Sequence, residues 1–129
     1  ILKQFIKHLT VGENEVVLLD MEAGVEHFGR GVDNSVDLIL MIVDPSFESL
    51  KLTKKIQQLG ESIGKTVFFV LNKVNGQILP TMLESIDDQS KVLAVISEDT
   101  EIARKGLLGN ELMMEIPEIH TLAREILKQ

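Results

Sequence analysis

Four short apolar runs, each closed by a polar residue and mostly separated by helical patterns, constrain the fold of this chain more than any other feature. The runs cover residues 16–19, 38–43, 66–71 and 92–96, and the residues that close them are Asp20, Asp44, Asn72 and Ser97. The first run, VVLL, shows no alternation of apolar and polar residues, as expected of a strand that helices cover on both faces. This organisation predicts an α/β domain of three layers, α/β/α, around a mostly parallel sheet.

The polar residues that close the runs form the first candidate site. In open parallel sheets ligands bind outside the carboxyl ends of the strands, so all four side chains are expected on one rim. For Asp44 and Ser97 a plainer explanation stays open, namely that a polar residue merely ends a strand. Asp20 and Asn72 have more informative neighbours.

The segment that follows Asp20 has the composition of a switch loop. Residues 21–31 contain three glycines and four charged or titratable side chains, those of Glu22, Glu26, His27 and Arg30. Glycines let a backbone move between conformations, so this segment is expected to respond to a ligand at the rim. Because imidazole and carboxylate are common ligands of divalent metal ions, a transient metal site on Glu22, Glu26 and His27 is one hypothesis. Hydrogen bonds across the loop or a dimer face are the simpler alternative, so no metal ligand is assigned.

Helical periodicity and capping residues define the elements between the strands. Helices are predicted over residues 2–9, 47–63, 79–86, 100–106 and 118–128. Ser46 and Asp99 are placed to cap the second and fourth of these helices, and Gly64 to end the second in a left-handed conformation. A chain of 129 residues with this pattern fits one domain.

Composition disfavours several classes of function. The net charge of −7 and the pI near 4.9 disfavour nucleic-acid binding, which needs a basic footprint on phosphates. Because the chain has no cysteine, it forms neither disulfides nor thiolate metal sites. No apolar stretch approaches the ~20 residues of a membrane span and no signal-peptide pattern is recognisable, so a cytoplasmic location away from membranes is expected.

Four segments resemble a known group of ATPases. They read DMEAGVEHFGRG from Asp20, VDLILMIVDPSFESL from Val36, FVLNKV from Phe69 and VISEDTEIARKGLLGNEL from Val95. In this order the first three are similar to the CooC-type ATPases, accessory proteins for nickel insertion into carbon monoxide dehydrogenase within the MinD- and ParA-like, SIMIBI-class P-loop ATPases. The fourth resembles a segment of that wider family, which has proline where this chain has Ser97. The likeness covers nearly all 129 residues, and its discriminating elements are EAG, EHFGRG and VDPS.

The resemblance implies roles for the first rim residue and for the loop after it. Asp20 would hold a magnesium-bound water, which suits a cation that keeps several waters. Gly24 would bring a backbone N–H near the terminal phosphate, and residues 21–31 would respond to the loss of that phosphate. Asp20 and Gly24 are therefore the expected catalytic positions. ATP or ADP with magnesium are the expected cofactors of the complete protein.

The resemblance also implies a place for the nucleotide base. Asn72 and Lys73 are similar to the pair that contacts the purine. The next strand would line the base pocket with Ser97, Glu98 and Asp99. In GTPases the motif that matches residues 72–75 ends in an aspartate, which accepts hydrogen bonds from both guanine N–H groups. This chain has Asn75 at that position. A neutral amide does not accept both as a carboxylate does, so adenine is expected.

The chain departs from the family in one respect. It contains no G-x-x-x-x-G-K-[ST] loop, whose backbone N–H groups and lysine hold phosphates. The resemblance implies that this loop, its strand and a Cys-x-Cys metal site belong to an N-terminal half. Residues 1–129 therefore resemble the C-terminal part of the nucleotide-binding domain. Alone, this part is expected not to hydrolyse ATP, which leaves its status as an enzyme open.

The same resemblance predicts how the chain associates. The strand that precedes the phosphate loop would lie between the strands that end at Asp20 and Asp44. Its absence would leave unpaired strand edges, which are costly to bury. We therefore expect a homodimer or an N-terminal partner segment, with carbon monoxide dehydrogenase as a candidate client.

Other classes of function stay open. A degenerate MinD- or ParA-like interaction domain, or a regulatory ATPase fragment, would keep the fold without a role in metal insertion. A MinD-type membrane helix is disfavoured for residues 118–128, because their polar face mixes acidic and basic side chains where membrane-surface helices prefer basic ones. A hydrolase with Glu22 and Glu26 as a carboxylate pair would need a more rigid platform than a glycine-rich loop.

Overall fold

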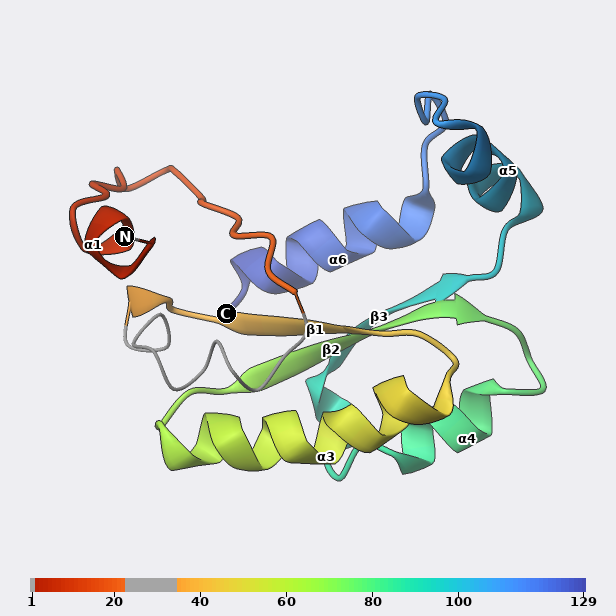
Figure 1. Ribbon diagram of the computed structural model, residues 1–129, viewed down its shortest axis with the longest axis horizontal. Helices are drawn as coiled ribbons and strands as arrows, with labels where there is room; N and C mark the ends of the chain where they lie inside the picture. The colour runs from red at the N-terminus through yellow and green to blue at the C-terminus, as the bar shows by residue number, and fades with distance from the viewer. Residues whose placement is uncertain (1, 23–34) are drawn as a thin grey trace.

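A parallel sheet forms the centre of the computed structural model, which describes residues 2–22 and 35–129. Among these residues three strands pair in the order β1 (Ile39–Val43), β2 (Val67–Val74) and β3 (Val92–Ser97). The helices are α1 (Leu2–Lys7), α3 (Phe47–Ser62), α4 (Leu79–Glu84), α5 (Thr100–Leu108) and α6 (Pro117–Leu127), with a 3-10 turn, η2 (Gln89–Lys91), before β3. Helices α3 and α4 cover one face of the sheet and α6 covers the other (Figure 1). The predicted three-layer α/β fold is confirmed.

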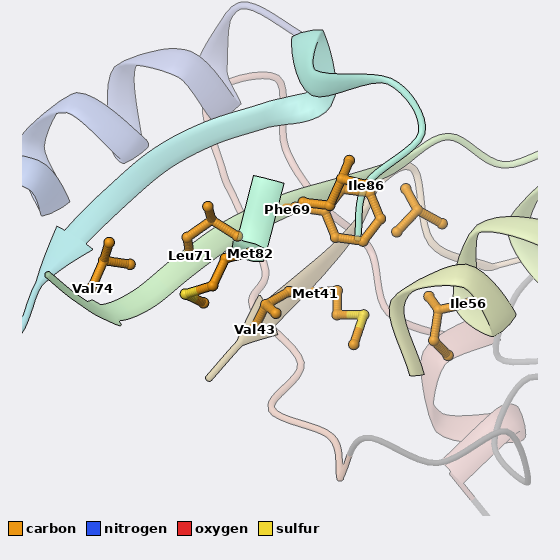
Figure 2. Close-up of a cluster of buried hydrophobic side chains, with 9 residues drawn as sticks. Met41, Val43, Ile56, Phe69, Leu71, Val74, Met82 and Ile86 are labelled. Atoms are coloured by element: carbon orange, nitrogen blue, oxygen red, sulfur yellow. The ribbon is translucent and has the colours of Figure 1, made fainter. Parts of the chain in front are cut away.

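Strand β2 is buried on both faces because its side chains alternate between two apolar clusters. The larger cluster, between the sheet and helices α3 and α4 (Figure 2), consists of Met41, Val43, Ile56, Val67, Phe69, Leu71, Val74, Met82 and Ile86. The smaller cluster, between the sheet and α6, consists of Phe68, Val70, Leu93, Ala94 and Leu122. A central parallel strand is expected to be apolar throughout for this reason.

The predicted caps bound the helices. Ser46 Oγ accepts a hydrogen bond from the Ser49 N–H at the start of α3. The Asp99 carboxylate accepts two backbone N–H groups at the start of α5. Gly64 follows α3 with a φ of 68°, the left-handed conformation that a side chain disfavours. In the described parts of the chain, no helix has both the length and the apolar character that crossing a bilayer requires.

The first predicted strand, residues 16–19, is not formed, and this prediction is wrong. Residues 15–22 belong to neither a helix nor a strand, and the side chains of Val16, Val17 and Leu18 are 62%, 46% and 82% exposed. A strand persists only where a neighbouring backbone pairs with it. The outer edge of β1 also has no neighbour among the described strands. Within residues 2–22 and 35–129, one edge of β1 and the apolar segment at residues 16–18 therefore have no paired strand.

Candidate functional site

The carboxyl ends of β1 and β2 bring three polar side chains together. Asp44 follows β1 directly, and Asn72 and Lys73 lie near the end of β2. Asn72 Nδ2 donates a hydrogen bond of 2.9 Å to Asp44 Oδ1, and Lys73 Nζ lies 2.6 Å from the other carboxylate oxygen, Oδ2. One carboxylate therefore joins the ends of two strands, and these three residues are called the Asp44 cluster below.

A bulge in β2 makes this cluster geometrically attainable. Leu71 pairs with Val95 and Val74 with Ser97, so three residue steps on β2 lie opposite two on β3. Consecutive residues of a regular strand point to opposite faces, whereas Asn72 and Lys73 both reach Asp44. Bulges are frequent beside active sites because they redirect a side chain in this way.

Lys73 also has an unusual backbone conformation. Its φ is 55°, the one positive value at a non-glycine residue within the described ranges. A side chain disfavours this left-handed region, and residues held in it gather at functional sites. The backbone at the end of β2 therefore departs from regular strand geometry at the residue whose side chain reaches Asp44.

The start of α3 holds Asp44 in place. The Asp44 N–H donates a hydrogen bond of 3.1 Å to Ser49 Oγ, and its carbonyl accepts one of 2.8 Å from the Ser46 N–H. Ser46 is itself the N-cap of α3. The segment DPSFES therefore fixes both the backbone and the position of the aspartate that receives Asn72 and Lys73.

Asp44 keeps its charge at neutral pH. Partial burial by itself raises the pKa of Asp44, but hydrogen bonds from Lys73 and Asn72 and the positive charge of Lys73 outweigh this effect and hold the pKa below its ordinary value. The side chains of Lys73 and Asp44 are 61% and 41% exposed, so the ion pair adds little to stability. Its main effect is to fix the geometry of the cluster.

The residues predicted to line the base pocket lie at the end of β3. Ser97 is the last residue of that strand, and the Glu98 N–H donates a hydrogen bond of 2.9 Å to the Val74 carbonyl. Ser97 and Asp99 line a hollow of about 230 Å³, whose other walls come from Ile96, α5 and residues 114–118. No residue of the Asp44 cluster lines this hollow. The two halves of the predicted base site are thus on the same edge but are separate here.

The structure describes only some of the predicted catalytic and switch residues. Asp20 and Glu22 are exposed, and Asp20 follows no strand, so its predicted place at a strand end is wrong in this structure. The other predicted positions lie outside the described residues: Gly24, Glu26, His27 and Arg30. In residues 2–22 and 35–129 no group of three or more His, Asp or Glu side chains could hold a metal ion.

Asp44 makes more contacts than a residue that merely ends a strand. The alternative that it merely ends a strand does not account for its contacts with Asn72 and Lys73. A signal was present, because Asp44 is the second residue of the VDPS element and Ser46 caps the next helix. The bulge that brings Asn72 and Lys73 to the same carboxylate had no comparable signal.

Comparison with known proteins decides the family. The MinD cell division protein of Aquifex aeolicus shares the fold over 74% of this chain and 45% of its own, with a TM-score of 0.59 and 15% identity. An uncharacterized ATP-binding protein of Methanocaldococcus jannaschii is 44% identical over 128 residues, 99% of this chain and 51% of that protein. The carbon monoxide dehydrogenase accessory protein CooC of Rhodospirillum rubrum is 33% identical over 110 residues, 84% of this chain and 42% of CooC. The chain belongs to the family of these CooC-like ATP-binding proteins, and its fold is that of MinD.

This assignment confirms the resemblance seen in the motifs. The chain spans about half the length of its CooC-like relatives. No family model matches it. For a CooC-like protein the Asp44 cluster lies where nucleotides bind in open α/β sheets, beyond the carboxyl ends of parallel strands.

Proposed function

We propose that this chain supplies the base-binding edge of an adenine-nucleotide site in a CooC-like ATPase. The Asp44 cluster carries the proposal, because a charged carboxylate, a bulge and a left-handed lysine organise Asn72 and Lys73 at the ligand-binding edge of the sheet. The ATP-binding relatives support the choice of nucleotide. In this proposal Asn72 and Lys73 contact adenine, and the end of β3 lines the pocket with Ser97, Glu98 and Asp99.

The phosphates and magnesium involve residues outside the Asp44 cluster. We assign Asp20 to a magnesium-bound water and Gly24 to the terminal phosphate, as the family resemblance implies. The exposed carboxylate of Asp20 fits this assignment, since magnesium is held through water by carboxylates. Residues 21–31, with Glu22, Glu26, His27 and Arg30, would respond to the phosphate.

Hydrolysis requires a partner that provides a phosphate-binding loop with its lysine. The open edge of β1 and the exposed side chains of residues 16–18 support a missing strand between them. An N-terminal half of the same protein is the first candidate for this partner, and a second copy of the chain is the other. Edge strands and apolar segments of this kind are normally paired in a folded protein.

We further propose that the complete protein assists nickel insertion into carbon monoxide dehydrogenase. The support is the 33% identity with CooC. The complete protein is expected to accelerate nickel-dependent activation of that enzyme, and an Asn72→Ala variant is expected to slow it. Equal activation with and without the protein would remove this role but leave the nucleotide site intact.

Nucleotide titration tests the proposed site. Calorimetry with ADP is carried out on this chain alone and on this chain assembled with an N-terminal half from a CooC-like relative. We expect binding only in the assembly, and we expect Lys73→Ala to weaken it. Lys54→Ala serves as a matched control, because Lys54 is an exposed lysine on α3 away from the sheet edge. Micromolar binding by the chain alone would contradict the incomplete-site view, and no binding in either would contradict the nucleotide function.

A second candidate, an interaction domain without nucleotide turnover, is favoured by one observation. The large apolar side chains of Leu107, Leu108 and Met113 are 87%, 58% and 81% exposed at and after the end of α5. Exposed apolar patches often mark binding surfaces. This candidate predicts that Leu107→Ser abolishes partner capture while nucleotides have no effect on capture.

A further inference from the structure

We infer that Asp44 selects adenine over 6-oxopurines by holding the side-chain amide of Asn72 in one orientation. The inference deepens the proposed function and rests on it, because it concerns the same base-binding edge. Asp44 itself does not touch the base in this account. It is a positioning residue that acts through Asn72.

The chemistry of the contact determines which way the amide faces. An ionised carboxylate only accepts hydrogen bonds, so the Asn72 atom 2.9 Å from Asp44 Oδ1 is the amide nitrogen. The carbonyl oxygen of Asn72 then faces elsewhere. It has no hydrogen-bond partner among the described residues and is not sealed from solvent. The amide therefore offers an acceptor to a ligand.

The carboxylate has little freedom to release the amide. Its second oxygen lies 2.6 Å from Lys73 Nζ, and the backbone of Asp44 is bound by Ser46 and Ser49 at the start of α3. Rotating the carboxylate away from Asn72 would also break the contact with Lys73. Two side chains and a helix start thus converge on one orientation of Asp44.

This orientation discriminates between purines at position 6. Adenine carries an amino group there, which donates hydrogen bonds, whereas guanine and hypoxanthine carry an oxygen, which accepts them. An Asn72 oxygen directed at the base accepts from the adenine amino group and repels a 6-oxo group. Without Asp44 the amide is free to turn by about 180° and to serve either base, because its two ends have nearly the same shape.

The test compares ATP with inosine triphosphate, whose base has an oxygen at position 6 and a proton on N1. Dissociation constants are measured on the chain assembled with an N-terminal half from a CooC-like relative. We expect the wild type to prefer ATP by about tenfold or more, the scale of a well-placed base contact. Asp44→Asn, whose own amide can accept or donate, is expected to bring this preference close to unity.

The control is Lys73→Met, which removes the ion pair but keeps the Asp44 carboxylate. This variant is expected to bind both nucleotides more weakly and to keep the preference for ATP. An Asp44→Asn variant that loses affinity for both nucleotides equally would show a merely structural role and overturn the inference. A wild type without preference would also overturn it. Failure of the assembled wild type to bind either nucleotide would overturn the proposed function as well.

Discussion

Lys73 Nζ lies 2.6 Å from Asp44 Oδ2, although the backbone of Lys73 has an unfavourable left-handed φ of 55°. A left-handed conformation costs a residue with a side chain roughly 1–2 kcal/mol. An ion pair as exposed as this one contributes about 0–1 kcal/mol. The free energy of the ion pair therefore does not offset the strain of the left-handed backbone. The conformation that brings Lys73 to Asp44 lowers the stability of the protein.

Two substitutions separate the strain at Lys73 from its ion pair. Lys73→Gly and Lys73→Ala both remove the contact with Asp44, but only glycine adopts a φ of 55° without strain. We expect the glycine variant to be more stable than the alanine variant by about 1 kcal/mol in urea unfolding. Both are expected to weaken nucleotide binding. Equal stability of the two variants would show that Lys73 is not strained.

Acid should weaken the Asp44 cluster. The pKa of Asp44 is lower in the folded than in the unfolded protein, so its contribution to stability is present above the ordinary value of about 3.9 and is lost as pH falls through the folded pKa. We expect the difference in unfolding free energy between wild type and Asp44→Asn to be less than about 1 kcal/mol at pH 6 and smaller at pH 3.

Comparing the wild type with Asp44→Asn cancels the effect of Asp88, the other carboxylate whose pKa the fold lowers. A hydrogen bond from Ser90 lowers the pKa of Asp88, but Asp88 is present in both proteins and its effect cancels. A stability difference that widens between pH 6 and pH 3 would mean that the folded pKa of Asp44 is raised instead.

Much of the fold followed from local signals. Gly64 ends α3 and Asp99 caps α5 as predicted, because caps depend on a few neighbouring residues. The strand predicted at residues 16–19 did not form, because a strand also needs a neighbouring backbone. An apolar run indicates that a segment can be buried in a sheet. It does not indicate whether a neighbouring strand is present to pair with that segment.

Less of the candidate site was predictable. Asp44 directly follows β1 and Ser97 is the last residue of β3, as predicted, whereas β2 continues past Asn72 to Val74. All three lie at one edge because parallel strands share their carboxyl edge. The contacts inside the cluster depend on the register between β2 and β3, and that register shifts at Asn72 and Lys73. Such a shift has no signature in the residues themselves, so the partner of Asn72 was found only in three dimensions.

Helix α3 can be tested where it touches β2. A Cβ on Gly60 would lie 2.5 Å from Val67 Cγ2 and 2.9 Å from the Lys65 carbonyl, closer than real Cβ contacts. Gly60→Ala is therefore expected to destabilise the protein by about 1–3 kcal/mol. The matched control is Gly106→Ala in α5, where a Cβ would meet nothing within 4 Å. That variant is expected to stabilise by about 0.5–1 kcal/mol. Thermal unfolding of both gives the signs, and destabilisation by both would contradict the packing at Gly60.

Thr53 joins α3 to the end of α4 inside the protein. Its side chain is fully buried, and its hydroxyl lies 2.6 Å from the Leu50 carbonyl and 3.0 Å from the Ser85 carbonyl. Thr53→Val keeps the shape but removes the donor, so we expect a loss of about 1–2 kcal/mol in urea unfolding. Thr53→Ser keeps the donor and should restore the hydrogen bond but not the methyl packing. An unchanged Thr53→Val protein would mean that the hydroxyl contributes nothing.

Amide NMR spectra recorded as ADP is added to the assembled protein test the central claim most directly. We expect the signals of the Asn72 side-chain amide and of the Lys73 and Ser97 backbone amides to shift, because the base meets the carboxyl edge of the sheet. Shifts confined to the outer face of α3, around Lys54, with the Asp44 cluster unchanged, would contradict it.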